Sequence, residues 1–315
     1  MQDQYAEVGR QTADLWVTQK KPPVELKQLK VFLGRTSVPE EDSLAQIYRR
    51  IPGAGRSKFA YQGSMLTHAG RYSDLDNLLV SLIETRFDQR FPLRIHDMAA
   101  SNAITSYELF EKLRGHSHLE FIASDYHDAL KVVTPPEQSW SAVLDRDGIM
   151  LQVEDNGAVF TPARRFRWSR LAEMTRSYFV RQRLSLLIRL AGKANMEEIL
   201  PLWHPKCVAL AESDRRFVLR REDLFNPQPG QYDVLRIMGT IARFSKDALP
   251  GLFAWLLPLV VEGGLFVAGD TGTYLEDTRR ATIFERRGRS FISIGDWNGG
   301  FSLRADVERV RLPEA

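Results

Sequence analysis

The sequence predicts an α/β fold, built on a doubly wound sheet that ends in an antiparallel hairpin. From residue 91 onward, short apolar runs alternate with segments of helical period. Strands that alternate with helices in this way form a mostly parallel sheet. The runs over residues 281–294 instead alternate apolar and polar side chains about a turn, which is typical of a terminal antiparallel hairpin.

Residues 1–90 are predicted to form a helical N-terminal cap, followed by an α/β domain over residues 91–315. The clearest helix of the cap begins near Ser73, a residue type favoured at N-caps, and its apolar residues share one face as far as Ile83. The cap is therefore expected to be a separate element that packs on the domain.

The first part of the domain is predicted to contain strand–helix units. A strand over residues 91–97 leads through small residues into a helix over residues 105–114. A second strand is predicted over residues 119–125, and the run 129–133 is predicted to begin another helix.

A small β-meander is predicted as an insert over about residues 138–165. Its short alternating runs are separated by Asp147-Gly148 and Asn156-Gly157, which are dipeptides that favour tight hairpin turns. A helix with an apolar stripe is expected over residues 168–191. The parallel sheet then resumes, with strands over 217–220, 232–238 and 264–269 and a helix over 249–259.

The composition excludes several classes of function. The 43 basic and 40 acidic side chains give a net charge of +3, which would not hold a nucleic acid at physiological salt. No apolar run is long enough to span a membrane and the N-terminus does not resemble a secretion signal, so we expect a cytoplasmic protein without membrane contact. The single cysteine, Cys207, is expected to be a small buried residue, and the basic run from Arg164 to Arg183 to be a solvated helix surface.

Small residues follow the first strand of the domain. Asp97 ends this strand, and the next helix begins after Ala99, Ala100 and three further small or polar residues. Small side chains let backbone amides approach a ligand at the mouth of a sheet. Asp125 ends the next strand, where doubly wound domains place a carboxylate that accepts hydrogen bonds from ribose hydroxyls. These positions predict a site for an adenosine-containing cofactor.

Five segments, taken in order, resemble the class I S-adenosylmethionine-dependent methyltransferases, and within them the chemotaxis-receptor methyltransferase type. The segments cover residues 95–107, 122–126, 221–227, 231–244 and 261–269. The resemblance extends over about half of the chain and implies a Rossmann-like domain with S-adenosylmethionine as its cofactor. It implies cofactor contacts at Asp97, Ala99, Ala100, Ser101, Asn102, Ala103, Asp125, Tyr126, Asp223 and Leu224.

Two departures from the family pattern bear on activity. The family's loop is rich in glycine, whereas Ala103 stands here at a glycine position, so we expect a backbone without positive φ and weaker cofactor binding. The Arg-Asn pair of the chemotaxis type is replaced by Met238-Gly239, which leaves methylation of protein glutamates unsupported.

We therefore expect methyl transfer to a small, partly hydrophobic molecule that binds near Ile237, Met238 and Gly239. The catalytic residues are not evident from the sequence, although His96 beside the loop is a candidate general base, with a hydrogen-bonded structural histidine as the alternative. No metal is expected, because the sequence contains no set of residues with the spacing of a standard metal site.

Three other functions remain open. The first is a non-catalytic protein of the same fold that binds a cofactor or a partner. The second is a protein carboxyl methyltransferase of the chemotaxis type. The third, a nicotinamide-dependent oxidoreductase, would fit Asp125 but lacks the Gly-x-Gly-x-x-Gly loop.

Overall fold

The computed structural model describes residues 67, 69–87, 92–133, 140–148, 150–155, 158–160, 197–244, 246–270 and 279–312. These residues fall into two compact units. One unit comprises residues 67–126 and 204–312, and the other comprises the described residues between 127 and 203. Helix α5 (Ser73–Phe87), which the sequence assigns to the cap, belongs to the first unit.

The first unit is built on a seven-stranded sheet in the order β12-β11-β10-β9-β1-β2-β8. The five strands from β10 to β8 run parallel, and β11 and β12 complete the sheet as an antiparallel pair. The strands are β1 (Leu93–Met98), β2 (Leu119–Asp125), β8 (Phe217–Arg221), β9 (Tyr232–Met238), β10 (Val260–Asp270), β11 (Arg280–Arg287) and β12 (Ser290–Trp297).

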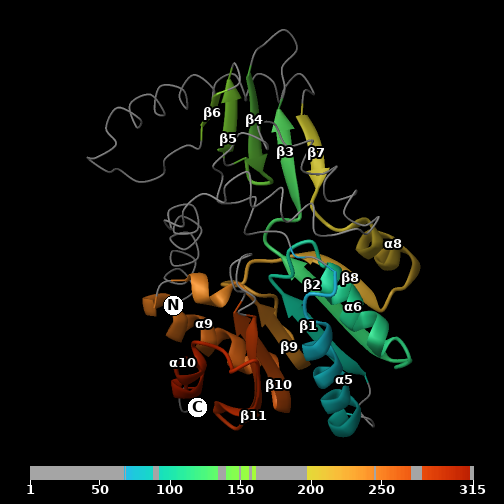
Figure 1. Cartoon of the computed structure of the whole chain (residues 1–315), viewed down its shortest axis with the longest axis vertical. Helices are drawn as coiled ribbons and strands as arrows, with labels where there is room; N and C mark the ends of the chain where they lie inside the picture. The colour runs from blue at the N-terminus through green and yellow to red at the C-terminus, as the bar shows by residue number, and fades with distance from the viewer. Residues whose placement is uncertain are drawn as a thin grey trace. The chain divides into compact units, whose positions relative to one another are not determined.

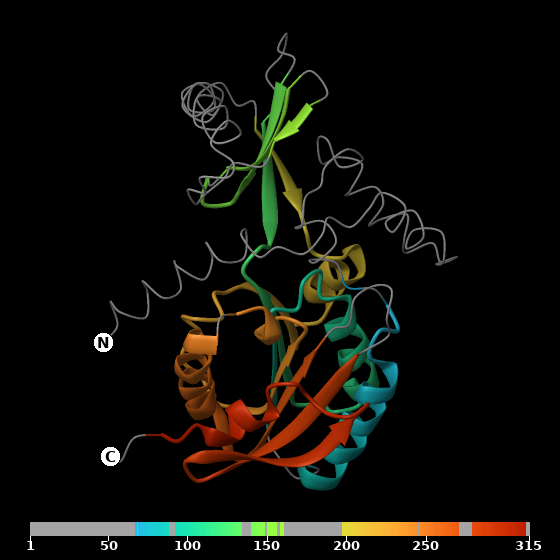
Figure 2. The same ribbon diagram turned by 60° about the vertical axis from the view of Figure 1, so that its left-hand side comes forward.

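Helices cover both faces of this sheet, as Figures 1 and 2 show: α5 and α6 (Ile104–Leu113) lie on one face, and α9 (Leu249–Leu256) and α10 (Arg304–Arg309) lie on the other. Helix α8 (Pro205–Ser213) precedes β8. Three short 3₁₀ helices, η2 (Ile241–Arg243), η3 (Lys246–Ala248) and η4 (Leu257–Leu259), lie between β9 and β10. The doubly wound α/β fold and the terminal hairpin that the sequence predicts are thus confirmed.

The second unit contains a five-stranded antiparallel sheet in the order β6-β5-β4-β3-β7. Its strands are β3 (Ala129–Val133), β4 (Trp140–Asp145), β5 (Met150–Asp155), β6 (Ala158–Phe160) and β7 (Glu197–Pro201). The two predicted hairpins are confirmed by the pairing of β4 with β5 and of β5 with β6.

Strands β3 and β7 of this sheet lie outside the predicted insert of residues 138–165, and the described residues of the second unit fall between 127 and 203. The run 129–133 is strand β3, not a helix, because it pairs on both sides with β4 and β7. Three predictions fall outside the described residues: the helix over residues 168–191, the basic run from Arg164 to Arg183, and residues 1–66 of the cap. Within the described residues, no helix is long and apolar enough to cross a membrane.

Successive side chains of a strand point to opposite faces of the sheet, and β9 shows this clearly. Leu235 and Ile237 pack in a buried apolar cluster with Phe253 of α9. Arg236, between them, has no exposed surface and faces the other side. Its Nη1 donates to Asp76 Oδ1 of α5 at 2.6 Å, and its Nη2 donates to Asp97 Oδ2 of β1 at 2.5 Å.

This buried ion cluster joins three elements, and Ser106 of α6 adds a fourth by donating from Oγ to Asp97 Oδ2 at 2.6 Å. One guanidinium faces two buried carboxylates, so the cluster carries an excess negative charge if both are ionised. Burial, together with the nearby Asp97, accordingly raises the pKa of Asp76 to about 6, although the Arg236 charge opposes this shift. With this pKa, the Asp76 carboxyl is protonated below about pH 6 and ionised above it.

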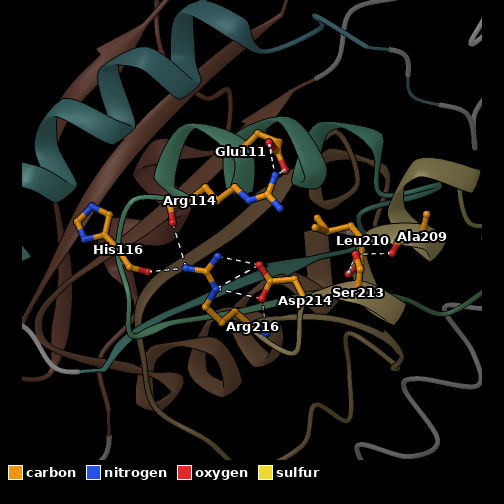
Figure 3. A network of polar contacts seen from close by, with 8 residues as sticks. All are labelled: Glu111, Arg114, His116, Ala209, Leu210, Ser213, Asp214 and Arg216. Atoms are coloured by element: carbon orange, nitrogen blue, oxygen red, sulfur yellow. Dashed lines mark hydrogen bonds and ion pairs between the residues drawn. The ribbon is translucent and has the colours of Figure 1, made fainter.

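A second polar network lies at the amino-terminal edge of the sheet (Figure 3). Arg216, just before β8, donates to both carboxylate oxygens of Asp214, at 3.0 and 2.7 Å. It also donates to the main-chain oxygens of Arg114 and His116, both at 3.0 Å. The network ties the end of α6 to the start of β8. It lies at the edge where the parallel strands begin, so it belongs to the framework of the domain.

The raised pKa of Asp76 predicts the pH dependence of stability of an Asp76→Asn variant. The unfolded pKa is near 3.8 and the folded pKa about 6, so the stability from the protonated carboxyl is present below about pH 4 and is lost as the pH rises through 6. Asparagine cannot ionise, so the variant should gain free energy of unfolding relative to the unchanged chain as the pH rises over this window.

Urea unfolding at several pH values between 4 and 8 measures this difference. The control is Asp306→Asn on α10, because the side chain of Asp306 is 40% exposed. A variant that loses stability relative to the unchanged chain as the pH rises would contradict the excess charge of the cluster.

Candidate functional site

The candidate site lies at the carboxyl edge of the parallel strands. Because β1, β2, β8, β9 and β10 run in the same direction, the residues that follow them meet at one edge of the sheet. Ligands of open α/β sheets bind outside this edge. The structure therefore brings together the residues after β1, β2, β8 and β9 that the sequence predicts as cofactor and substrate contacts.

The loop between β1 and α6 has an unusual backbone. Ala99, Ser101 and Ala103 adopt positive φ angles of 56°, 60° and 64°, in the left-handed region that favours glycine. The expectation that Ala103 excludes positive φ is therefore wrong. A non-glycine residue pays about 1–2 kcal/mol for this conformation, so the loop stores strain at three alternate positions.

Hydrogen bonds hold the loop in this shape. The N–H of Ser101 donates to Asp125 Oδ2 at 2.7 Å, and the N–H of Ala100 donates to the Ser124 oxygen at 2.9 Å. The N–H of Ala103 closes a turn onto the Ala100 oxygen at 3.0 Å. The end of β2 thus fixes the loop that follows β1, and the Asp125 carboxylate lies against the loop backbone.

Two predicted contact residues use their side chains for the fold. Asn102 is buried: its Oδ1 accepts from the N–H of Ile104 at 3.2 Å, and its Nδ2 donates to the Thr67 oxygen at 3.3 Å. Asp97 is 2% exposed and belongs to the buried ion cluster. Neither side chain is presented to a ligand, although the loop backbone that they anchor is.

Asp223 and Leu224 belong to a tight turn, residues 223–226, that begins two residues after Arg221, the end of β8. Asp223 Oδ1 accepts from the N–H of Phe225 at 2.9 Å, and the Asp223 oxygen accepts from the N–H of Asn226 at 2.9 Å. Burial raises the pKa of the Asp223 carboxyl. Tyr126 follows β2 and is half-buried. Because β2 pairs with β8, Asp125, Tyr126 and this turn lie at neighbouring strand ends.

His96, the candidate general base, is a structural residue. Its ring has no exposed surface, and Nε2 lies 2.8 Å from Ser124 Oγ and 3.2 Å from Glu222 Oε2. Its centroid lies 4.7 Å from that of the Tyr232 ring. Burial raises the pKa of Glu222, but hydrogen bonds and charge from His96 outweigh this and lower it overall. A ring enclosed in this way cannot reach a substrate.

The three residues predicted to contact a substrate differ in their surroundings. Ile237 is fully buried in the apolar core on the α9 face, so its side chain does not line a site. Met238 is partly exposed at the end of β9, and a Cβ added to Gly269 would collide with its Cε. Gly239 has a φ of 74° and donates its N–H to the Gly269 oxygen at 2.8 Å. Only Met238 offers side-chain surface at the edge.

Other candidate groups lie outside this site. Cys207 is buried in α8, as predicted, and burial raises the pKa of its thiol to about 12, which leaves it protonated and unreactive. Within the described part of the chain, no group of three or more histidine, cysteine or carboxylate residues could hold a metal ion.

The sequence interpretation missed Arg236, Glu222 and Arg221. Arg236 could have been flagged as a charge between the apolar residues Leu235 and Ile237 of a strand, which requires a buried partner. Arg221 is the last residue of β8 and lies opposite Asp125 in the sheet register. Sequence order does not show that β8 is the neighbour of β2, so this pairing had no signal in the sequence.

Several solved structures that are similar to this chain are methyltransferases. No protein-family model matches the chain, and no curated protein matches it. Three similar solved structures are the DszA carbon methyltransferase (12% identity, TM-score 0.36, 79% of this chain), the plantazolicin methyltransferase BpumL with SAH (12%, 0.32, 86%) and coclaurine N-methyltransferase with N-methylheliamine and SAH (9%, 0.29, 85%).

The matches span 51%, 62% and 53% of these three neighbours, so this chain corresponds to little more than half of each. Such low TM-scores do not establish a common fold, and the strand order and register described above carry the fold assignment. None of the three neighbours is described as a chemotaxis-receptor methyltransferase.

The strained backbone predicts that glycine stabilises the loop at Ala99. An Ala99→Gly variant should gain about 0.5–1 kcal/mol in free energy of unfolding, because glycine removes the left-handed strain but adds chain entropy to the unfolded state. The matched control is Ala100→Gly, because Ala100 is not among the residues with positive φ; this variant should lose about 0.5–1 kcal/mol. Equal losses in both variants, measured by urea unfolding, would argue against strain at Ala99.

Proposed function

We propose that this chain binds S-adenosylmethionine and transfers its methyl group to a small, partly hydrophobic acceptor. The observation that carries the proposal is the contact between Asp125 and the loop after β1. Three left-handed residues shape this loop, and the Asp125 carboxylate holds the N–H of Ser101 at 2.7 Å. Strain of this kind is retained at functional sites when the surrounding structure fixes it.

The residues present fit an adenosine-containing ligand. A carboxylate offers about four acceptor positions, so Asp125 can hold the loop and still accept hydrogen bonds from ribose hydroxyls. Ser101 Oγ is buried and has no hydrogen-bond partner within the described residues, a condition that calls for a ligand or a water. Tyr126 and the Asp223 turn lie at the neighbouring strand ends, where the base attached to that ribose would lie.

When bound, S-adenosylmethionine supplies an activated sulfonium methyl group, so the protein's contribution is mainly to position the acceptor and to exclude water. In this proposal the loop and Asp125 orient the cofactor, and Met238 gives apolar surface to the acceptor at the end of β9. No general base is assigned, because His96 is enclosed in the core.

A second candidate is a non-catalytic protein that binds the same cofactor. Two sequence features suggested this candidate: the absence of glycines from the loop and the Met238-Gly239 pair. The loop nevertheless keeps positive φ at Ala99, Ser101 and Ala103, so the absence of glycines gives less support to a non-catalytic role. Methylation of protein carboxylates is not part of the proposal. Only the sequence resemblance to the chemotaxis type suggested it, and the Arg-Asn pair of that type is absent.

Titration calorimetry with SAH and with NAD tests the proposal. The full chain should bind SAH and not NAD. Asp125→Ala should weaken SAH binding by about 1.5–3 kcal/mol, or roughly 10- to 150-fold, because two charge-assisted hydrogen bonds to the ribose are lost. Asp125→Asn, which keeps one carbonyl oxygen, should lose less.

Asp306→Ala on the exposed side of α10 is the control and should bind SAH as the unchanged chain does. Binding of NAD without binding of SAH would refute the cofactor assignment. Unchanged SAH affinity in a folded Asp125→Ala variant would refute the role of this carboxylate.

A further inference from the structure

The turn that leaves β2 is held by Arg221, the last residue of β8, and by Glu222, which follows it. The N–H of Glu222 donates to the Asp125 oxygen at 3.0 Å, and Nε of Arg221 donates to the Tyr126 oxygen at 3.3 Å. The guanidinium carbon of Arg221 also lies 5.4 Å from the centre of the Tyr126 ring. One arginine side chain therefore contacts both the main chain and the aromatic ring of the residue that follows Asp125.

This double contact holds the Arg221 guanidinium beside the Tyr126 ring. A guanidinium near an aromatic face is attracted to the ring electrons, and its planar fork can donate to a carbonyl at the same time. A lysine ammonium lacks this planar fork. Both residues are half-buried, so the contact is partly shielded from water, and Tyr126 keeps part of its surface exposed at the carboxyl edge.

We propose that Arg221 is a positioning residue that holds Tyr126 as the platform on which the adenine of the cofactor stacks. The inference rests on the proposed function and deepens it. If the Asp125 carboxylate binds the ribose, the base attached to that ribose lies within reach of the adjacent residue. A flat ring whose rotation is already restricted loses little entropy when a base stacks on it.

The test is SAH binding by the full chain in a double-mutant cycle. Tyr126→Leu should weaken binding about tenfold, since a base stacked on an aromatic ring is lost. Arg221→Met should weaken it about threefold to fivefold. In the Tyr126→Leu background, Arg221→Met should have no further effect, because the arginine acts through the ring.

Arg221→Lys is the second variant, in case the methionine variant does not fold, and should weaken binding about twofold to threefold because it keeps the charge without the fork. Arg309→Met on α10 is the control, since the side chain of Arg309 is 78% exposed. Unfolding curves of all variants separate loss of the fold from loss of binding.

The outcomes separate the two proposals. SAH binding that Arg221→Met and Arg221→Lys leave unchanged overturns the positioning role and leaves the cofactor assignment standing. Equal losses on Arg221→Met in both backgrounds show that Arg221 acts through the main chain alone, and this also overturns the platform. Absence of SAH binding by the unchanged chain at millimolar concentration overturns both proposals.

Discussion

The first unit is organised around one buried guanidinium. Arg236 lies in the middle of β9 and bonds to Asp76 and Asp97, which come from positions 160 and 139 residues away. Since a charge without a partner is costly in an apolar interior, the burial of Arg236 in β9 requires the carboxylates that α5 and β1 supply. Asp97 also receives the Ser106 hydroxyl, so the same cluster fixes both ends of the loop that leads from β1 into α6.

That loop shows that backbone conformation, and not glycine content, defines this strand-to-helix turn. Left-handed alanines and serines are unfavourable in isolation, yet Asp125, the Ser124 oxygen and the buried Asn102 constrain the chain from several directions. Each contact opposes relaxation to a negative φ. The local cost is therefore offset by contacts that are made elsewhere in the unit.

Local pattern was sufficient to predict much of the fold. Strands β2 and β9 begin and end where the apolar period indicates, and the terminal hairpin follows from alternation. The run 129–133 was assigned to a helix because short apolar runs do not distinguish the two states. The left-handed conformation of Ala103 and the contact of Arg221 with Tyr126 depend on segments distant in sequence, which local propensity does not describe.

The chain enters the inserted sheet through β3 and leaves it through β7, and these two strands pair with each other. Strand β3 pairs with β7 so that Ala129 lies opposite Pro201, and the N–H of Leu202 donates to the Asp128 oxygen at 2.9 Å. Opposed residues of such a ladder are about 5 Å apart, so a short turn could bridge the same gap. The pairing of β2 with β8 does not require what lies between. A change in the length of the segment between these two ends would therefore leave unchanged the gap that the chain must span and the register of β2 with β8.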